Sequence, residues 1–306
     1  MQPFVFNTTA RLVCESGAAA ALGLHAKAIL GAKALFVTDP GLRAIGLERP
    51  AMMSLEAEGV EICVFDAVEA DPSLATVIAA TEMAVSAGAT GVIGFGGGSS
   101  MDVAKLAALL AGSGEDIEQA WGVGNARGPR LPLVLVPTTA GTGSEATPVS
   151  IITVGENEKR GVSSQLLLPD MAILDADLTL GLPAPITAAT GIDAMVHAIE
   201  AYVSKNPNNN PVSAMLAREA LALLGAHIET AVREPDNRAA RQSMLLGSML
   251  AGMAFANSPV AAVHALAYPI GGMFHIPHGL SNALVLPHVL SFNVAERKND
   301  SWRGYA

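Results

Sequence analysis

Apolar and polar positions divide the chain into two halves with different periodicities. In the first half, short apolar runs alternate with longer segments in which apolar residues recur every three or four positions. The runs at 34–39, 60–65, 90–95 and 131–137 are predicted as buried strands, and the segments 43–59, 72–88 and 101–113 as helices. Pro50 lies within the first helical segment, where it is expected to start or kink a helix. This alternation indicates βαβ units and a parallel, Rossmann-like sheet with helices on both faces.

The strand pattern stops at about residue 183. Helical periodicity continues through 187–204, 210–234 and 238–258, and the Asn/Pro-rich stretch 205–211 between the first two is predicted as a loop. Two prolines within 182–185 coincide with the loss of strand character. We therefore predict an α/β domain at 1–182 followed by an all-α domain at 183–306.

Composition restricts the classes of partner. The chain has 306 residues, of which 51% are hydrophobic, and this is enough for one or two well-packed cores. Its net charge of −10, without a Lys/Arg cluster, argues against a nucleic-acid partner. The sequence shows neither a long uninterrupted apolar run nor a signal-peptide pattern, so we expect a cytoplasmic protein without a membrane partner. Cys14 and Cys63 are too few for a disulfide framework or a cysteine-based zinc site.

One helical segment carries an unusual polar pair. Asp193 and His197 are four residues apart in a stretch that is otherwise rich in Ala, Ile and Met, so their side chains share one helix face. They can converge on a metal ion. Alternatively, Asp193 caps the start of a helix and His197 is a core histidine bonded to a carbonyl group.

Further histidines are concentrated downstream of this pair. The chain has seven histidines, and four of them lie within 262–288, namely His264, His275, His278 and His288. One or two of these can be packing or capping residues. A set of one carboxylate and several imidazoles is typical of a site for Fe²⁺ or Zn²⁺.

Two loops that follow predicted strands suggest a nucleotide site. The segment 94–105 places three consecutive glycines and two serines before a helix, a composition that favours binding of a phosphate or pyrophosphate group, although a tight strand-to-helix turn also uses glycine. The segment 137–148 supplies hydroxyls and glycines at the same sheet edge, or is simply a polar loop. Asp39 ends a strand, where it can accept hydrogen bonds from a ribose or begin an ordinary turn.

Taken together, FGGGSSMDVAK, PTTAGTGSEATP, TAATGIDAMVHAIEAYVS and VHALAYPIGGMFHIPHGLSNALVLPH closely resemble the iron-containing (group III) alcohol dehydrogenases, as far as about Phe292. The resemblance implies a dehydroquinate synthase-like fold, with a metal between an NAD(P)-binding α/β domain and a helical domain. It implies assembly into a homodimer or larger homo-oligomer. Its metal ligands fall on Asp193, His197, His264 and His278, whereas His275 and His288 are not at ligand positions.

The resemblance also assigns residues to the cofactor. It makes Gly97, Gly98 and Ser99 the pyrophosphate cradle, and it places Asp102, Thr138, Thr139 and Ser144 along the cofactor. Lys159 would approach the ribose on the nicotinamide side. Asp39 matches an acidic position associated with NAD rather than NADP, because a carboxylate repels a 2′-phosphate.

The sequence departs from the family pattern at two places. Tyr268 replaces a histidine that in many members contacts substrate or relays protons, so it is either a catalytic group or a wall of the pocket. Residues 295–306 carry no helix-like apolar stripe and do not resemble the family, from which we expect a truncated or frame-shifted reading frame with apolar surface left exposed.

The expected activity is metal-dependent hydride transfer between a small alcohol, or its aldehyde, and NAD, with Fe²⁺ as the implied metal and Zn²⁺ as the alternative. A hydroxyacid or polyol dehydrogenase of the same superfamily and an inactive remnant are the competing interpretations.

Overall fold

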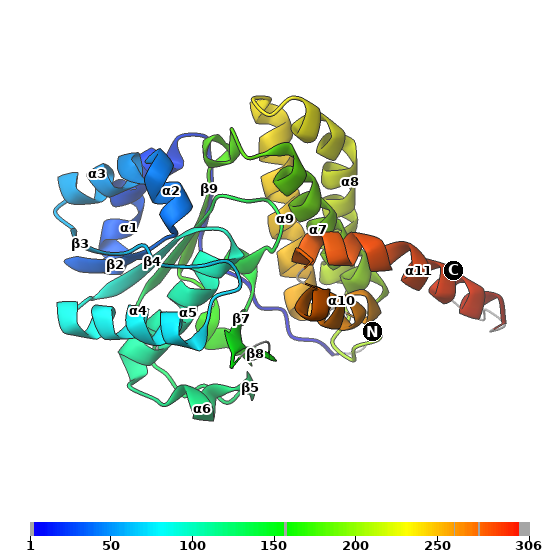
Figure 1. Cartoon of the computed structure of the whole chain (residues 1–306), viewed down its shortest axis with the longest axis horizontal. Helices are drawn as coiled ribbons and strands as arrows, with labels where there is room; N and C mark the ends of the chain where they lie inside the picture. Colours follow the sequence, from blue (N-terminus) through cyan, green and yellow to red (C-terminus); the bar gives the residue numbers. More distant parts are fainter. Residues whose placement is uncertain (1–2, 156–157, 260, 275, 300–306) are drawn as a thin grey trace.

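The computed structural model describes residues 3–155, 158–259, 261–274 and 276–299. The first half of the chain forms an open sheet with helices on both faces, and the second half is a bundle of helices beside the carboxyl ends of the strands (Figure 1). The fold class predicted from the sequence is confirmed, and α7, the first helix of the second half, begins at Ala184.

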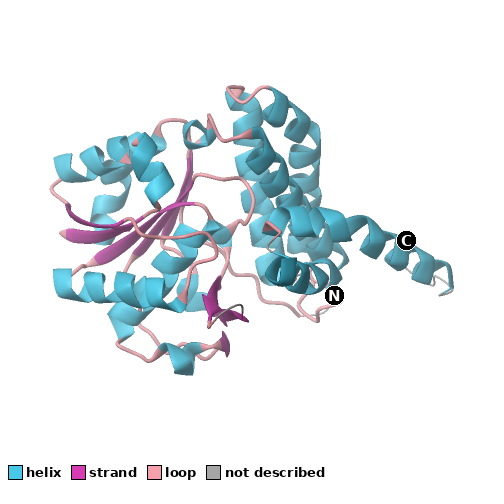
Figure 2. Ribbon diagram, in the orientation of Figure 1, coloured by secondary structure: helices cyan, strands magenta, loops and turns pink. Residues whose placement is uncertain are grey.

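The main sheet has six parallel strands in the order β1-β9-β6-β4-β2-β3. Their bounds are β1 Leu12–Cys14, β2 Lys33–Val37, β3 Glu61–Phe65, β4 Gly91–Gly96, β6 Leu133–Pro137 and β9 Met171–Leu174. All four strands predicted from the sequence are present, whereas β1 and β9 were not predicted. These two strands pair with each other and extend the sheet at one edge (Figure 2).

Alternate residues of the strands supply two separate cores. Leu35 and Val37 of β2 pack with α4 (Leu74–Ala87) and α5 (Gly98–Ser113), while Ala34 and Phe36 pack with α1 (Leu22–Leu30) and α3 (Arg49–Ala57). This two-sided burial explains why the strands read as continuous apolar runs. Because α5 follows β4 and packs on one face of the sheet, its amino end lies at the carboxyl ends of the strands.

The single helix predicted at 43–59 was wrong. The structure has two helices there, α2 (Pro40–Ile45) and α3, separated by Gly46 in a left-handed conformation with φ 70°. Asp39 caps α2 by accepting a hydrogen bond from the Leu42 N–H, and Pro50 lies in the first turn of α3. A left-handed glycine ends a helix, and a proline is tolerated at the start of the next one.

A small second sheet covers one side of the sheet edge. Its strands are β5 (Gly122–Val123), β8 (Glu158–Ser163) and β7 (Val149–Val154), in that order, with β7 and β8 antiparallel. The short helix α6 (Ile117–Ala120) precedes β5, and four 3-10 turns complete this half: η1 Ala18–Ala21, η2 Ser144–Ala146, η3 Gln165–Leu167 and η4 Ala176–Thr179.

The helical half consists of α7 Ala184–Val203, α8 Pro211–Arg233, α9 Arg238–Asn257, α10 Ala262–Phe274 and α11 His278–Asn299. Helices α7, α8 and α9 share a core rich in alanine, which allows close helix packing, and α10 and α11 contact α7 through a smaller cluster around Val196 and Val263. Helix α11 continues to Asn299, so the loss of the apolar stripe after Val294 does not end the helix.

No single helix within the described ranges is long and apolar enough to cross a membrane, although α9 and the first part of α10, which are bent by 107° relative to each other, meet the criteria as a pair.

Candidate functional site

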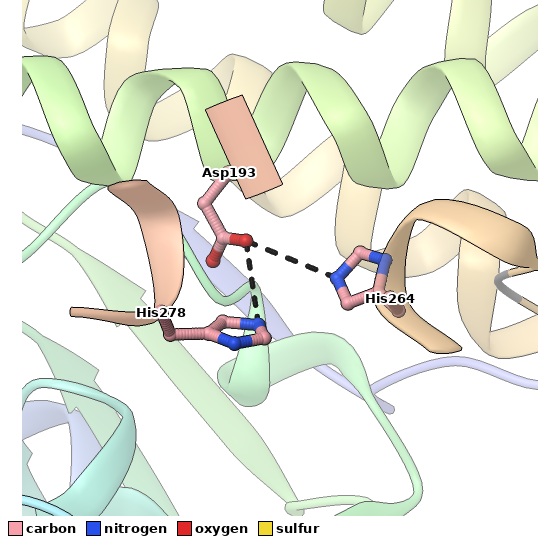
Figure 3. A group of neighbouring side chains, drawn as sticks. All are labelled: Asp193, His264 and His278. Carbon is pink, nitrogen blue, oxygen red and sulfur yellow. Dashed lines mark ion pairs between the residues drawn. The ribbon is translucent and has the colours of Figure 1, made fainter. Parts of the chain in front are cut away.

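Three of the four expected metal ligands converge at the junction of α7, α10 and α11. The Oδ1 atom of Asp193 lies 3.8 Å from Nε2 of His264 and 3.6 Å from Nε2 of His278 (Figure 3). Asp193 and His264 are buried, and His278 is about one-third exposed. One carboxylate oxygen and two imidazole nitrogens within 4.8 Å of one another form a donor set that suits Fe²⁺ or Zn²⁺.

His197 lies beside this group rather than within it. Its ring stacks on His264, with centroids 4.6 Å apart, and on Phe255 at 4.4 Å. Burial lowers the pKa of His197 to about 4, so the imidazole is neutral at physiological pH. Its Nδ1 atom is buried and has no hydrogen-bond partner among the described residues. A neutral imidazole with an unsatisfied nitrogen next to the cluster is chemically suited to ligate a metal.

Asn282, which the sequence analysis missed, places its amide at the centre of the cluster. The Nδ2 group donates to Asp193 Oδ1 and lies 3.3 Å from Nε2 of His264 and 3.2 Å from Nε2 of His278. One carboxylate oxygen and two ring nitrogens thus face one electropositive N–H₂ group, and the same three atoms could face a cation. The available signal was spacing, because Asn282 follows His278 by one helical turn.

Glu200 was also missed, although it lies on the same face of α7 as Asp193 and His197. Its Oε2 atom lies 2.6 Å from Nδ1 of His264, and its Oε1 atom accepts a hydrogen bond of 2.7 Å from the Val263 N–H. Burial alone would raise the pKa of Glu200, but the hydrogen bonds with His264 and the backbone hold it below the usual value. Glu200 is therefore an ionised carboxylate behind the cluster. The sequence signal was spacing, because His197 and Glu200 follow Asp193 by four and seven residues and so lie on one helix face.

The glycine-rich turn and Asp39 meet at the end of β4. Gly97 precedes α5 without a side-chain cap, so the first N–H groups of the helix remain available, and a Cβ at Gly98 would lie 2.8 Å from the Thr142 side chain. Ser99 is half-buried in the first turn of α5. The Asp39 carboxylate lies beside the turn, with Oδ2 3.5 Å from the position of a Cβ on Gly96. Asp39 therefore starts a turn as a helix cap, and its second carboxylate oxygen lies at the edge of the candidate cofactor site; its contact with a ribose stays a prediction.

The loop after β6 closes the same edge. The Thr138 N–H donates to the Gly96 carbonyl at 3.0 Å, and the Thr139 Oγ1 atom lies 3.6 Å from the position of a Cβ on Gly97. Ser144 donates to Asp102 Oδ1 at 2.7 Å. The expected cofactor residues of α5 and of this loop are thus in one place.

A buried lysine, Lys105, holds the loop after β6 through hydrogen bonds. Lys105 donates to the Ser144 hydroxyl and to the backbone carbonyls of Thr147 and Val149 at 2.8–3.0 Å. Burial lowers the pKa of Lys105 to about 8, an effect that the nearby Asp102 carboxylate opposes. Burial also raises the pKa of Asp102, although Lys105 and hydrogen bonds counteract it.

A cavity of about 700 Å³ lies between the small sheet and α10, beside the two groups of residues. The small sheet lines one side, including Ile151 and Lys159, and Tyr268 of α10 lines the other. The Ile151 N–H donates to Asp102, and the Tyr268 ring stacks on His278 with centroids 5.3 Å apart. Lys159 forms an ion pair of 2.6 Å with Asp71 while facing the cavity. Two residues of the cavity wall therefore contact the two groups, Ile151 through Asp102 and Tyr268 through His278, although neither Asp102 nor His278 lines the cavity itself.

The sequence analysis also named His288 and His275, which are not at expected ligand positions. His288 is exposed on α11, and His275 lies outside the described residues.

Comparison with known proteins accounts for both halves of the chain. The family model described as iron-containing alcohol dehydrogenase matches residues 9–176, and the model described as Fe-containing alcohol dehydrogenase family, C-terminal, matches residues 187–302. The second match passes beyond Phe292, so the expectation that the resemblance ends there was wrong.

Individual relatives agree with these matches. The chain is 46% identical over 267 residues to a long-chain-alcohol dehydrogenase of Geobacillus thermodenitrificans, covering 86% of this chain and 67% of that protein. The solved structure of a 1,3-propanediol oxidoreductase superposes with a TM-score of 0.92 at 36% identity, covering 96% of this chain and 77% of that one. A sulfoacetaldehyde reductase from Bifidobacterium kashiwanohense, solved in complex with NAD⁺, gives a TM-score of 0.88 at 30% identity, covering 96% and 77%. The chain belongs to the iron-containing alcohol dehydrogenase family.

Proposed function

We propose that the chain is a cytoplasmic, NAD-dependent dehydrogenase that transfers hydride between a small alcohol, or its aldehyde, and the cofactor, using a divalent metal. The observation that carries the proposal is the convergence of Asp193, His264 and His278. A cavity lies beside them, because its wall residue Tyr268 stacks on His278, and another wall residue, Ile151, donates to Asp102 on α5. His197, neutral and stacked on His264, is proposed as the fourth ligand. Fe²⁺ is the proposed ion, as in the name of the family, and Zn²⁺ is the alternative.

The chain's own residues would hold and orient the two reactants. A metal bound by Asp193, His197, His264 and His278 would supply Lewis acidity to an alcohol or carbonyl oxygen, and NAD would supply the hydride acceptor. The N–H groups at the start of α5, with Gly97, Gly98 and Ser99, suit a pyrophosphate group, because the helix dipole favours negative charge there.

The remaining cofactor contacts follow from position. We propose that Asp102, Thr138, Thr139 and Ser144 lie along the cofactor, and that Lys159 approaches the ribose on the nicotinamide side from the cavity wall. Asp39 would accept hydrogen bonds from the other ribose and repel a 2′-phosphate, which favours NAD over NADP.

Tyr268 is proposed as a wall of the substrate pocket and as a hydrogen-bond donor to substrate. Burial and nearby carboxylates raise the pKa of Tyr268 to about 12, so the phenol keeps its proton near neutral pH. It can donate a hydrogen bond there, but it does not act as a general base.

The chain is also proposed to assemble into a homodimer or larger homo-oligomer. Apolar side chains stand exposed on α10 and α11, among them Leu266, Leu284 and Phe292, and an assembled form would cover such a surface. Sedimentation velocity of the purified protein measures its mass in solution.

The deciding experiment is an anaerobic assay of metal-stripped protein reloaded with Fe²⁺ or Zn²⁺. NADH formation is followed with ethanol, 1-propanol, 1,2-propanediol, 1,3-propanediol and 4-hydroxybutyrate, and NADH consumption with sulfoacetaldehyde. We expect turnover that depends on the metal and falls to background in the His264→Ala variant. Substantial turnover by a metal-free His264→Ala preparation would refute the metal mechanism. If turnover were fastest with 4-hydroxybutyrate and sulfoacetaldehyde, the two anionic compounds, a hydroxyacid-type substrate would be favoured.

A further inference from the structure

We infer that Glu200 is a positioning residue that holds His264 in the one tautomer able to ligate a metal. The two side chains come from different helices, Glu200 from α7 and His264 from α10, and both are buried. Their atoms Oε2 and Nδ1 lie 2.6 Å apart. The inference rests on the metal site proposed above and assigns a role to a residue that none of the expected ligand positions includes.

The hydrogen bonds leave one arrangement of protons. The Glu200 carboxylate accepts the Val263 N–H through Oε1 and faces His264 Nδ1 through Oε2, so we infer that the ring proton lies on Nδ1 and is donated to Glu200. The Nε2 atom is then unprotonated. Its lone pair faces the cluster, where the Asn282 Nδ2 group, a donor, lies 3.3 Å away.

Glu200 itself is held by the backbone of the helix that it supports. Its Oε1 atom accepts the Val263 N–H at 2.7 Å, and the Ala261 N–H also contributes to its hydrogen bonds. Val263 is the residue before His264, so the same carboxylate fixes the start of α10 and the orientation of the ring. A carboxylate behind a ligating histidine is a recurrent way of fixing ring orientation and raising ligand basicity.

This arrangement makes Glu200→Gln a sharp test, because the two groups of a glutamine amide cannot be exchanged here. The amide oxygen must face the backbone N–H groups, since placing the N–H₂ there would oppose donor to donor in a buried site. The N–H₂ group then faces His264 Nδ1 and donates to it. The ring proton is forced onto Nε2, where it occupies the lone pair that a metal needs.

The experiment has two readouts. The first is the tautomer of His264 in metal-free protein labelled with ¹⁵N-histidine, recorded well above the ordinary histidine pKa of about 6.5 and assigned with His264→Gln. We expect the Nδ1–H form in the parent and the Nε2–H form in Glu200→Gln. The second is Zn²⁺ affinity measured by competition with a chromophoric chelator, which we expect to fall by about 10–100-fold.

Asp175→Asn is the matched control. Asp175 is also a buried carboxylate that accepts backbone N–H groups, from Gly17, Ala19 and Asp177, but it contacts no candidate ligand. A loss of stability alone would appear in both variants, whereas the tautomer change and the loss of affinity are expected only in Glu200→Gln. An unchanged tautomer in Glu200→Gln overturns the inference. Failure of the parent to bind Zn²⁺ or Fe²⁺ would instead refute the proposed function, and the tautomer would still be measurable.

Discussion

Substituting Gly279 with alanine tests whether α11 must lie directly against α7 for the candidate site to form. Gly279 follows His278 in the first turn of α11. A Cβ there would collide with the backbone carbonyl of Ala189 on α7, approaching the carbonyl carbon to 2.7 Å and Cα to 3.3 Å. Backbone atoms within a helix cannot rotate away as a flexible side chain can.

The size of the effect follows from this collision. Restoring an ordinary contact of 3.4 Å to the carbonyl carbon alone requires α11 to move by about 0.7 Å, and the carbonyl oxygen, which is closer still, requires more. His278 would move with it, whereas metal–ligand distances tolerate only about 0.2 Å. We expect Zn²⁺ affinity to fall by about 10–100-fold, the range found when groups that hold metal ligands are altered. Overpacking is expected to lower the free energy of unfolding by about 1–3 kcal/mol.

The assay is Zn²⁺ competition titration together with urea unfolding of the metal-free protein. Gly225→Ala is the control, because Gly225 is also helical, on α8, but a Cβ there meets no atom within 4 Å. That variant should keep its Zn²⁺ affinity and gain about 0.5–1 kcal/mol of stability from the helix-forming alanine. Parental affinity and stability in Gly279→Ala would refute the reasoning.

Substitutions at three further positions test the cofactor preference, a buried carboxyl group and the substrate pocket. Asp39→Asn keeps a cap for the Leu42 N–H but removes the charge, so kcat/KM with NADP should rise by roughly tenfold without a loss of Tm; an unchanged NAD/NADP ratio would contradict the role given to Asp39. Burial raises the pKa of Glu145 to about 7 from 4.5, so the folded chain binds its proton more tightly than the unfolded chain, and unfolding free energy should fall as pH rises from 4.5 to 7. Glu145→Gln should therefore raise the free energy of unfolding at pH 8 by up to about 3 kcal/mol, and by much less at pH 4.5. Glu82→Gln, at an exposed position, is the control and should not stabilise the protein at pH 8. Equal effects of Glu145→Gln on stability at both pH values would exclude this explanation. Tyr268→Phe should leave the shape of the pH–rate profile unchanged, whereas Tyr268→His should add an ionisation between about pH 5 and 8. If one limb of the pH–rate profile disappeared in Tyr268→Phe, the phenol would titrate during turnover, which would contradict the role given to Tyr268.

The central strands were predictable because they are buried on both faces, which leaves a mark in each short stretch of sequence. β9 carries a similar apolar run, MAIL, but it has only four residues, and β1 has three, which is too short for a pattern. β1 is a strand because it pairs with β9, and the two strands are far apart in the sequence, so no short stretch of residues indicates their contact. β8 is mostly polar, with the sequence EKRGVS, and among its side chains only Val162 is buried; it is a strand because it pairs with β7.

The site was predictable to the extent that helix geometry relates its residues. Spacing within one helix places Asp193 and His197 together, and the same rule extends to Glu200 on α7 and links Asn282 to His278 on α11. Glutamate and asparagine are common on helices, so spacing alone did not distinguish them from solvated residues. The way that α10 and α11 cross α7 depends on tertiary packing, and this packing decides that the His197 ring stacks on His264 instead of joining the three-residue group.

The three helices that supply the candidate ligands also determine when a metal can bind. Asp193 and Asn282 meet across 89 residues, and Glu200 and His264 across 64, so the unfolded chain cannot gather these groups without a large loss of conformational entropy. A bound ion therefore acts as a removable cross-link between distant segments. At a free metal concentration one thousand times Kd, it would add about 4 kcal/mol to the stability of the fold. Metal loading of the proposed site would then follow folding, and resistance to unfolding would measure how many molecules carry the ion.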